Sequence, residues 1–446
     1  MRMTVIGCGY LGAVHAACMA ELGHEVIGID VDPEKVAALQ AARAPFFEPG
    51  LPELLERTMA TGRLTFTTDM SQAAGSAVHF VCVGTPQRRG EFAADMTYVD
   101  AAVDGLLAHV GPGELVVGKS TVPVGTAARL AAKVAERFSG GEPGAALAWN
   151  PEFLREGHAV EDTLTPDRLV YGVPGGPGST EGKAAKALLD EVYATPLGRG
   201  TPLIVTDYQT AELVKVAANS FLATKISFIN AMAELCEKVN ADVTQLADAI
   251  GHDDRIGRKF LNAGLGFGGG CLPKDIRAFM ARAGELGADQ TLTFLREVDS
   301  INMRRRIRMV DLAREVCEGS LIGKRVAVLG AAFKPLSDDI RDSPALNVAA
   351  QIRLQGGDVV LTDPAAVDNA RKAVPDISYA DSVEEAVRGA DVVLLLTEWK
   401  EYRELEPATI SGLVKEKRIL DGRNALDPGR WRAAGWTYRA LGRPRA

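Results

Sequence analysis

The strongest constraint on the fold is the succession of a strand, a glycine turn, a helix and a second strand at the start of the chain. MTVIGCGYLG joins a β-branched run to closely spaced glycines, AVHAACMAELG has apolar residues at helical spacing, and HEVIGID ends on an acid. A helix that joins two neighbouring strands makes them parallel, so this is a βαβ unit. Further strands are predicted within AVHFVCVGTP and ELVVGKST, and together they predict a parallel sheet wound with helices.

The same pattern occurs again near the end of the chain. KRVAVLGAAF, GGDVVLTDP and ADVVLLLTEW resemble MTVIGCGYLG, GHEVIGIDVD and AVHFVCVGTP in order and spacing. Between the halves, residues 210–239 are alanine-rich, apolar at helical spacing and free of proline and glycine, which predicts one long helix. We therefore expect an α/β protein with two Rossmann-like doubly wound domains, residues 1–205 and 311–446, joined by a central helical domain, residues 206–310.

Composition argues against several classes of protein. The chain has 446 residues, 47% hydrophobic and 24% charged, which is typical of a soluble globular protein of two or three domains. The net charge of −8 argues against nucleic acid or a membrane surface as a partner, because both attract basic proteins. No segment resembles a signal peptide or a membrane span, and the six cysteines show no CxxC pair, so we expect a cytoplasmic protein with reduced thiols and no metal. The run MRRRIR at 303–308 is predicted to be a solvated helix face.

A dinucleotide site is predicted at the first glycine turn. Gly7, Gly9 and Gly12 form GxGxxG between a strand and a helix, and Asp30 ends the next strand. Such glycines allow the tight turn, the approach of a pyrophosphate and close helix packing, while the acid hydrogen-bonds a ribose diol and repels a 2′-phosphate, which favours NAD over NADP. Lys35 is near enough to contact the adenosine end. The alternative is a βαβ turn that binds no phosphate. The second half has GAAF instead, so we do not expect it to bind a dinucleotide in the same way.

Cys271 is the candidate nucleophile. It lies between the glycine run GLGFGGG and a predicted helix in which Pro273 fits the first turn. The positive end of a helix favours a thiolate, which is a far better nucleophile than a thiol. Glycines in such a run let the backbone approach a ligand that side chains would block. The alternative is a structural role, since free cysteines are usually small buried hydrophobic residues.

The order of the motifs resembles that of a known family. GCGYLG, FVCVGTP, STVPVGT, NPEFLREG, the lysine-bearing helix and GFGGGCLPKD follow one another as in the UDP-glucose 6-dehydrogenases of the UDP-glucose/GDP-mannose dehydrogenase family. The likeness covers essentially the whole chain, including FKP and DGRN near its end. It implies oxidation of C6 of UDP-glucose from alcohol to acid with two NAD and one water. A thiolate explains the second oxidation, because it adds to the aldehyde and the thiohemiacetal can lose hydride to give a thioester.

The central helix carries Lys215 and Asn219, which share a face because they are four residues apart. Among apolar neighbours, desolvation would make Lys215 a usable base, or a cation that stabilises an alkoxide. Asp275 could position a water or relay a proton to Lys215, and the resemblance implies that the two act together on the C6 hydroxyl. Alternatively, Lys215 extends from a packed helix and Asp275 serves the first helical turn.

Two acids lie in NPEFLREG, Glu152 and Glu156, which we interpret as one helical turn apart. Carboxylates near a thioester can activate water by general-base catalysis. The resemblance implies that Glu152 acts in hydrolysis, that Thr121 holds a water and that Glu156 lies near the cofactor. A solvated acidic helix start is the alternative.

The resemblance also implies the remaining binding residues. For NAD they are Gly7, Gly9, Tyr10, Leu11, Gly12, Asp30, Lys35, Thr85, Thr121, Glu156, Lys274 and Arg341. For UDP-glucose they are Glu152, Phe153, Leu154, Lys215, Asn219, Arg255, Asn262, Phe267, Gly268, Phe333, Lys334 and Arg423. In a homodimer, which the apolar breadth of the central helix favours, Arg255 is implied to reach the neighbouring active site. Cationic side chains can bind a diphosphate even in an acidic protein.

Three alternatives stay open. GGGC in place of the more frequent GGSC, His15, and the extra arginines of QRRGEFAADM depart from the commonest family pattern, so GDP-mannose or a UDP-N-acetylhexosamine could be the substrate, although RIGRKFLNAG looks most like the UDP-glucose branch. A two-electron dehydrogenase of the hydroxyacid type shares the glycine turn, a lysine and an asparagine four residues later, but needs no cysteine. A non-catalytic NAD-responsive binding module is disfavoured by the joint presence of Cys271, Lys215 and Asp275.

Overall fold

The computed structural model describes residues 1–138 and 144–444, and the chain divides into two compact units. Unit 1 consists of Met1–Ala218 and Arg277–Gly287, and unit 2 consists of Asn219–Ile276 and Ala288–Ala446. Within the described residues, no helix combines the length and the apolar character that crossing a membrane requires.

The sheet of unit 1 follows the predicted βαβ pattern. Its strands are β1 (Arg2–Ile6), β2 (Glu25–Ile29), β3 (Leu64–Thr67), β4 (Val78–Val81), β5 (Leu115–Gly118), β6 (Ala146–Trp149), β7 (Leu169–Gly172) and β8 (Leu203–Thr206). Their order in the described part of the sheet is β3-β2-β1-β4-β5-β6-β7-β8. All neighbours pair in parallel except β6 and β7, which are antiparallel.

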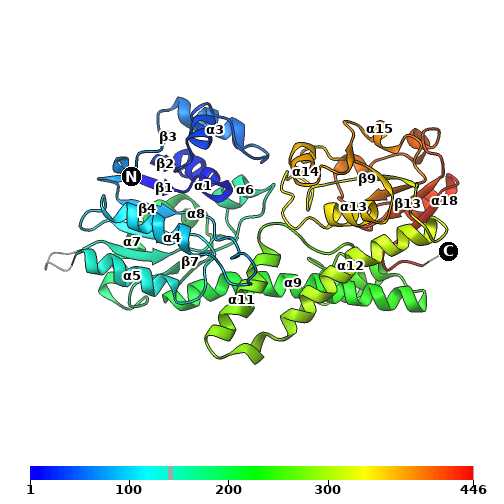
Figure 1. Ribbon diagram of the computed structural model, residues 1–446. Helices are drawn as coiled ribbons and strands as arrows, with labels where there is room; N and C mark the ends of the chain where they lie inside the picture. Colours follow the sequence, from blue (N-terminus) through cyan, green and yellow to red (C-terminus); the bar gives the residue numbers. More distant parts are fainter. Residues whose placement is uncertain (139–143, 445–446) are drawn as a thin grey trace. The chain divides into compact units, whose positions relative to one another are not determined.

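Helices cover both faces of this sheet (Figure 1). They are α1 (Tyr10–Glu21), α2 (Pro33–Gln40), α3 (Leu51–Ala60), η1 (Met70–Ala73), α4 (Thr97–Leu107), α5 (Thr126–Arg137), α6 (Ala159–Leu164), α7 (Thr180–Val192) and α8 (Ala194–Gly198). Met3 and Val5 of β1 belong to a core shared with α1, α3, α6 and α7, whereas Ile6 belongs to a core shared with α4 and α5. A strand buried on both sides in this way is characteristic of a doubly wound sheet.

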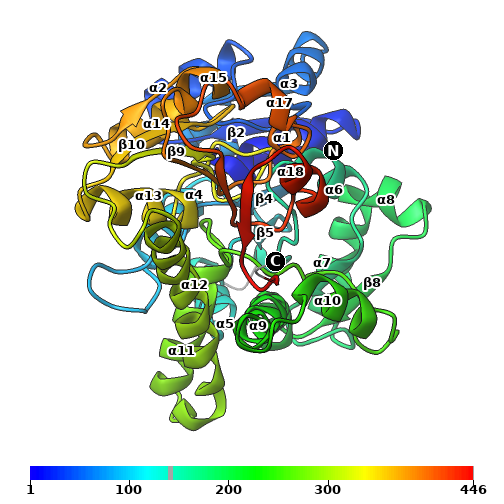
Figure 2. The same ribbon diagram turned by 90° about the vertical axis from the view of Figure 1, so that its right-hand side faces the viewer.

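Unit 2 contains most of the long helical segments. Its helices, two of which also contribute residues to unit 1, are α9 (Tyr208–Val239), α10 (Val243–Gly251), α11 (Leu272–Glu285), η2 (Asp289–Leu292), α12 (Phe294–Val316), α13 (Pro344–Leu354), α14 (Val367–Ala373), α15 (Val383–Val387), α16 (Lys400–Arg403), α17 (Pro407–Ile410) and α18 (Pro428–Ala433). The single helix predicted for residues 210–239 lies within α9 and is confirmed. In Figure 2, α12 lies beside α13, and these two helices pack together.

The second sheet repeats the strand order of the first. Its strands are β9 (Arg325–Leu329), β10 (Asp358–Thr362), β11 (Ser378–Tyr379), β12 (Val392–Leu395), β13 (Arg418–Asp421) and β14 (Thr437–Ala440). The described strands are all parallel, in the order β11-β10-β9-β12-β13-β14, which matches β3-β2-β1-β4-β5-β6 position by position. The predicted α/β class, with two parallel-sheet domains and a helical middle, is confirmed.

The basic run at 303–308 departs from the prediction of a solvated face. Arg305 and Arg306 of α12 are buried, with 0% and 2% of their surface exposed. Arg305 donates to Glu237 at 2.9 Å, and Arg306 donates to Asp342 at 2.7 Å. The prediction was wrong because the carboxylates that compensate these cations lie 36 residues or more away in the sequence, and a buried cation is tolerated only when it is paired.

His15 is a buried polar residue in the core of unit 1. Its ring contacts the ring of Phe80 edge-on, with centroids 4.4 Å apart, and neither ring nitrogen has a hydrogen-bond partner among the described residues. Burial lowers the pKa of His15 well below its ordinary value, and the charge of Lys119 lowers this pKa further. The folded protein therefore holds His15 as a neutral imidazole.

We expect the free energy of unfolding to decrease as the pH falls below about 6.5, the ordinary pKa of histidine. In that range the unfolded chain binds a proton at His15 and the folded chain does not, so protons favour unfolding by up to about 1.4 kcal/mol per pH unit. His15→Phe should flatten this decrease, whereas His252→Gln at an exposed position should leave it unchanged. Urea unfolding at several pH values between 5 and 8 measures the effect. Equal slopes for His15→Phe and the wild type would contradict it.

Candidate active site

The glycine turn after β1 leaves no room for side chains at two of its three glycines. A Cβ atom on Gly12 would lie 1.8 Å from the carbonyl oxygen of Gly7. Gly7 has a φ of +88°, and its N–H donates to the carbonyl of Ile29 at 2.7 Å. A Cβ atom on Gly9, in contrast, would meet no atom within 4 Å. Gly9 therefore borders open space at the start of α1, where free N–H groups and the helix dipole favour an anion.

Asp30, directly after β2, is buried against this turn. Its Oδ2 accepts a hydrogen bond from the N–H of Cys8 at 2.7 Å. Nζ of Lys35, the lysine expected near the adenosine end, lies 3.0 Å from the same oxygen. The Lys35 side chain keeps 28% of its surface exposed, so a ribose hydroxyl can replace it as a donor. The turn, the acid and the open space at Gly9 fit a dinucleotide.

The equivalent acid of unit 2, Asp363, is enclosed by its own chain. Its Oδ2 accepts hydrogen bonds from the N–H groups of Ala331 and Ala332, at 2.7 and 3.0 Å, and from the indole of Trp399 at 3.1 Å. Its Oδ1 accepts from two further backbone N–H groups at 2.9 Å each. With its acceptor positions occupied, Asp363 has none left for a ribose. This supports the prediction that the second half does not bind a dinucleotide in the same way.

Further predicted cofactor residues lie at the carboxyl ends of neighbouring strands, where α/β sheets bind ligands. Thr85 and Thr121 follow β4 and β5, and the Thr85 hydroxyl donates to the carbonyl of Thr121 at 2.8 Å. Tyr10 and Leu11 lie at the start of α1 and pack against the core. The Tyr10 hydroxyl donates to the carboxylate of Glu48, so it is directed into the protein.

Glu152 lies in a loop between β6 and α6, and not in a helix. Its Oε1 accepts hydrogen bonds from the N–H groups of Phe153 and Leu154, at 2.8 and 3.1 Å. A carboxylate that binds nearby backbone N–H groups competes with helix formation, so the interpretation of Glu152 and Glu156 as one helical turn apart was wrong. Glu156 is 8% exposed, which also excludes the solvated alternative for this residue.

Glu152 pairs with a lysine that the sequence analysis missed. Lys119 directly follows β5, is 3% exposed, and its Nζ lies 3.0 Å from Oε2 of Glu152. Burial lowers the pKa of Lys119, but the negative charge of Glu152, with smaller contributions from Tyr193 and Cys82, outweighs it and raises this pKa above its ordinary value. The sequence did contain a signal for this lysine: it stands at the end of the apolar strand LVVG, and a cation buried there needs a buried partner.

Lys215, on α9, lies beside an aromatic ring of the same loop. Its Nζ is 5.5 Å from the ring centroid of Phe153, and the guanidinium of Arg168 is 3.9 Å from the same centroid. Both cations are within the range of cation–π attraction. Lys215 is half-buried, and Asn219 follows one helical turn later, as predicted.

Cys271 differs from the other cysteines, all of which are described. It is exposed at the N-cap of α11, where its carbonyl accepts the N–H of Asp275 at 2.9 Å, and Pro273 occupies the first turn as predicted. Burial raises the thiol pKa of Cys8, Cys18, Cys82, Cys236 and Cys317. These five are held as neutral thiols, and Cys271 is the cysteine whose position suits a nucleophile.

Asp275 is almost completely buried one turn after Cys271, with 1% of its surface exposed. Its Oδ2 accepts a hydrogen bond from Nδ2 of Asn219 at 2.6 Å, and Nζ of Lys274 lies 2.8 Å from Oδ1. Oδ1 itself accepts no hydrogen bond from the described residues, although it faces the lysine charge. The carboxylate is therefore anchored on one oxygen by Asn219, while its other oxygen is buried against the ammonium group of Lys274.

The glycine run before Cys271 packs against the chain itself. A Cβ atom on Gly269 would lie 2.8 Å from the ring of Phe333, and one on Gly270 would lie 2.3 Å from the guanidinium carbon of Arg341. The N–H of Gly269 also donates to the carbonyl of Arg341 at 2.8 Å. Packing within unit 2 thus requires a glycine at position 269, where φ is +83°, whereas Gly270 lies beside the flexible end of the Arg341 side chain. The sequence analysis did not include this reason for the glycine run.

Two arginines, Arg423 and the buried Arg306, hold the same run in place. Arg423 donates to the carbonyls of Gly266, Phe333 and Leu396 at 2.8, 3.2 and 2.8 Å. Arg306 donates to the carbonyl of Phe267 at 3.3 Å. A Cβ atom on Gly268 would lie 2.4 Å from the carbonyl oxygen of Asp342. Arg423, expected as a substrate ligand, therefore also organises the backbone around Phe267 and Gly268.

Other predicted substrate residues lie on the surface of unit 2. The Arg255 side chain is 89% exposed and pairs with Asp253 at 2.7 Å. Asn262 is exposed and accepts a hydrogen bond from Arg258 at 2.8 Å. Nζ of Lys334 lies 5.4 Å from the ring centroid of Phe333. Lys334 and Phe333 thus form a cationic and aromatic edge next to the glycine run.

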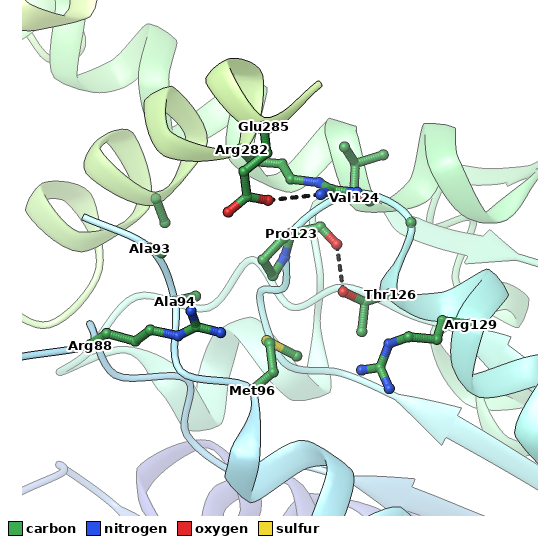
Figure 3. Close-up of a pocket in the computed structure, with 12 residues that line it drawn as sticks. Arg88, Ala93, Ala94, Met96, Pro123, Val124, Thr126, Arg129, Arg282 and Glu285 are labelled. Atoms are coloured by element: carbon green, nitrogen blue, oxygen red, sulfur yellow. Dashed lines mark hydrogen bonds and ion pairs between the residues drawn. The ribbon is translucent and has the colours of Figure 1, made fainter. Parts of the chain in front are cut away.

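A cavity of about 220 Å³ in unit 1 is lined by none of the predicted residues (Figure 3). It is bordered by the loop around Ala94, the start of α5 and the second half of α11. Three of the lining residues are arginines, and each pairs with a carboxylate: Arg88 with Glu91 at 3.8 Å, Arg129 with Asp100 at 2.7 Å and Arg282 with Glu285 at 2.8 Å. The positive charge around the cavity is therefore balanced.

Comparison with known proteins explains this combination of folds and residues. Models of the UDP-glucose/GDP-mannose dehydrogenase family match residues 1–196 as the NAD binding domain, 209–304 as the central domain and 327–428 as the UDP binding domain. The chain belongs to the UDP-glucose/GDP-mannose dehydrogenase family. It is an oxidoreductase that uses NAD, in agreement with the acid at position 30.

Individual relatives match over the full chain. The UDP-glucose 6-dehydrogenase of Rhizobium meliloti is 40% identical over 445 residues, which cover 100% of both chains. The structure of a UDP-glucose dehydrogenase from Pyrobaculum islandicum has a TM-score of 0.89 and 37% identity, and covers 99% of this chain and 98% of that one. The UDP-D-ManNAc dehydrogenase of Pyrococcus horikoshii has a TM-score of 0.85 and 27% identity over 100% of both chains.

We expect Gly9→Ala to keep the wild-type melting temperature but to bind NAD at least about tenfold more weakly, because the methyl group takes the space of the pyrophosphate. Gly12→Ala should instead lower the stability by about 1–3 kcal/mol, since its methyl group overlaps a backbone oxygen. Calorimetry of unfolding and NAD titration distinguish the two variants. Wild-type NAD affinity in Gly9→Ala would contradict the assignment of the open space at Gly9 to the pyrophosphate.

Proposed function

We propose that this family member oxidises UDP-glucose to UDP-glucuronate in two NAD-dependent steps, with Cys271 as the covalent nucleophile. The observation that carries this proposal is the exposed thiol at the N-cap of α11, one turn from the buried carboxylate of Asp275. The two-electron reaction of a hydroxyacid-type dehydrogenase does not require such a thiol. The full-length similarity to UDP-glucose 6-dehydrogenases supports the same reaction.

The reaction needs two hydride acceptors and one water. NAD, when bound, accepts a hydride in each oxidation. The C6 alcohol first loses a proton and a hydride to become an aldehyde, and the Cys271 thiolate adds to the aldehyde carbon. The oxyanion takes up a proton to give a thiohemiacetal, which then loses a proton and a second hydride to become a thioester. Water adds to the thioester carbon, the C–S bond breaks, and the acid leaves a thiolate behind.

Lys215, Asn219 and Asp275 are proposed to act on the C6 oxygen. Asn219 holds Asp275 through its amide, which supports a fixed carboxylate that positions a water or relays a proton. Lys215 is proposed to act with it as a base or as a cation that stabilises the alkoxide. Lys274, which is paired with Asp275, is proposed to contact the cofactor.

Glu152 is proposed as the base of thioester hydrolysis, with Thr121 holding the water and Glu156 near the cofactor. The support for Glu152 is its ordered carboxylate, which its loop and Lys119 hold by backbone hydrogen bonds and an ion pair. A base acts efficiently only when its acceptor oxygen has a defined direction.

UDP-glucose is proposed over other nucleotide sugars because the relatives named for it are the more similar ones. The similarity to the Pyrobaculum islandicum enzyme exceeds that to the Pyrococcus horikoshii UDP-D-ManNAc dehydrogenase in identity, 37% against 27%. The sugar nucleotide is proposed to contact Phe153, Leu154 and the segment around Phe267, Phe333 and Lys334. Arg341 is proposed as a cofactor contact. The division into domains at residues 205 and 310 is part of the same proposal.

A homodimer is proposed from an apolar stripe on α9. Phe221, Phe228, Leu235 and Val239 are 67%, 50%, 58% and 72% exposed, which is unusual for large apolar side chains on one helix. The first three repeat every seven residues and so lie on one face. A second copy of the chain can cover this stripe, and Arg255 is proposed to reach the neighbouring active site.

We expect the wild type to form two NADH for each UDP-glucose consumed and to release an acid. Cys271→Ser should reduce acid formation at least about a thousandfold, because a neutral hydroxyl cannot replace the thiolate. NADH absorbance with UDP-glucose, GDP-mannose and UDP-N-acetyl sugars measures the NADH yield per sugar and the effect of Cys271→Ser. One NADH per sugar and an unaffected variant would indicate a two-electron dehydrogenase, and no turnover with any sugar would indicate a binding module.

We expect Phe228→Glu to shift the sedimentation mass from dimer to monomer at micromolar concentration, because a charge would be buried in the apolar stripe. Leu354→Glu serves as the control, since Leu354 is 87% exposed and lies on another helix, at the end of α13. A monomeric wild type would contradict the proposed dimer.

A further inference from the structure

Lys119 lies in unit 1 with all of its hydrogen-bonding capacity in use. Its Nζ donates to Oδ1 of Asn150 at 3.0 Å and to the hydroxyl of Tyr193 at 3.2 Å. The third direction is taken by the ion pair with Oε2 of Glu152 at 3.0 Å. An ammonium group has three N–H donors, so no donor is left for a ligand. Lys119 therefore does not bind substrate or cofactor directly.

The surroundings of Lys119 fix its position. The Tyr193 hydroxyl donates to Oδ1 of Asn150 at 2.7 Å, and the Asn150 amide donates to the carbonyl of Val170 at 3.0 Å. Lys119 is thus attached to β7 and to Tyr193, the residue that follows α7, through a network of buried side chains. Holding a long flexible side chain in one position costs rotamer entropy, and the hydrogen bonds of this network offset that cost.

The contacts of Glu152 leave one acceptor position open. A carboxylate offers about four such positions, two on each oxygen. Phe153 and Leu154 occupy Oε1 with their N–H groups, and Lys119 occupies one position on Oε2. The remaining position is on Oε2, and the Glu152 side chain is 17% exposed. The oxygen that can take a proton is therefore the oxygen whose direction Lys119 determines.

We propose that Lys119 is a positioning residue for thioester hydrolysis, which holds Glu152 so that the open lone pair of Oε2 faces the attacking water. This inference rests on the proposed function and assigns a role to a residue outside the predicted site. In the step, the water oxygen bonds to the thioester carbon and its proton passes to Oε2. The C–S bond then breaks, the electron pair stays on the sulfur of Cys271, and the acid ionises.

A purely structural lysine would have a different effect. Loss of a structural lysine would slow binding and both hydride transfers together with hydrolysis, because the whole loop would change. Loss of a positioning lysine slows the step that uses Glu152 and spares the steps before it. The burst of NADH in the first turnover reports the hydride transfers, and the steady-state rate reports hydrolysis.

The test compares Lys119→Met, Glu152→Gln and the double variant with UDP-glucose and NAD. We expect Lys119→Met to keep a burst of two NADH per site within about threefold of the wild-type rate, and its steady-state rate to fall about 100-fold. Intact-protein mass spectrometry should then find the acyl group on Cys271. In the Glu152→Gln background, Lys119→Met should lower the steady-state rate by less than a further factor of about three, because Lys119 acts through the Glu152 carboxylate.

Two further variants keep the test decisive. Lys119→Arg retains the charge but directs its N–H groups differently, so we expect a normal burst and a steady-state rate reduced about tenfold. Lys133→Met removes a partly exposed lysine of α5 that is paired with Asp104, so it is the matched control and should behave as the wild type.

Three outcomes would overturn the proposal: a burst and a steady state slowed equally in Lys119→Met, no acyl-enzyme, or independent effects in the double variant. If Lys119→Met does not fold, a wild-type steady-state rate in Lys119→Arg would overturn it. Failure of the wild type to form NADH from UDP-glucose is a separate result and refutes the proposed function instead.

Discussion

The interaction on which both halves depend is the hydrogen bond from the turn after the first strand to the carboxylate that follows the second. In a parallel sheet these two ends lie side by side, and the N–H groups of the turn need acceptors. Asp30 accepts from Cys8 in unit 1, and Asp363 accepts from Ala331 and Ala332 in unit 2. The two carboxylates differ in the side chain that covers each of them. Asp30 is covered by the side chain of Lys35, which is 28% exposed, whereas Asp363 is covered by Trp399, which is 6% exposed, so one topology yields one dinucleotide site and one half with another use.

Local sequence patterns were sufficient for most of the fold and for placing the candidate nucleophile, Cys271, at a helix start. The strands and the long helix follow from the periodicity of apolar residues, which is a property of neighbouring positions. The exposed Cys271 and the buried Asp275 could be found for a similar reason, because a glycine run before a helix start is visible over a dozen residues. The repeat was visible because both halves keep the same strand order.

The buried charges could not be predicted, because their partners are distant in sequence. Arg305 and Arg306 have the composition of a solvated face, and only the fold brings carboxylates of α9 and of the segment before α13 to them. Lys119 is separated from Glu152 by a strand and a helix. The loop around Glu152 was misinterpreted for a related reason: four-residue spacing suggests a helix, but a side chain that accepts the N–H groups of the next two residues prevents one.

The attachment of the glycine run to the second sheet has a consequence for engineering. Arg423 holds Gly266, and the Phe333 ring fills the space that a side chain at position 269 would need, so the backbone that presents Cys271 is shaped by residues near the end of the chain. In a chimaera that took only its last third from a relative, residues of the other protein would therefore support the glycine run before Cys271. To exchange nucleotide preference, the two sequences are better fused before Gly264, because Cys271 and the residues that support its backbone then come from the same protein.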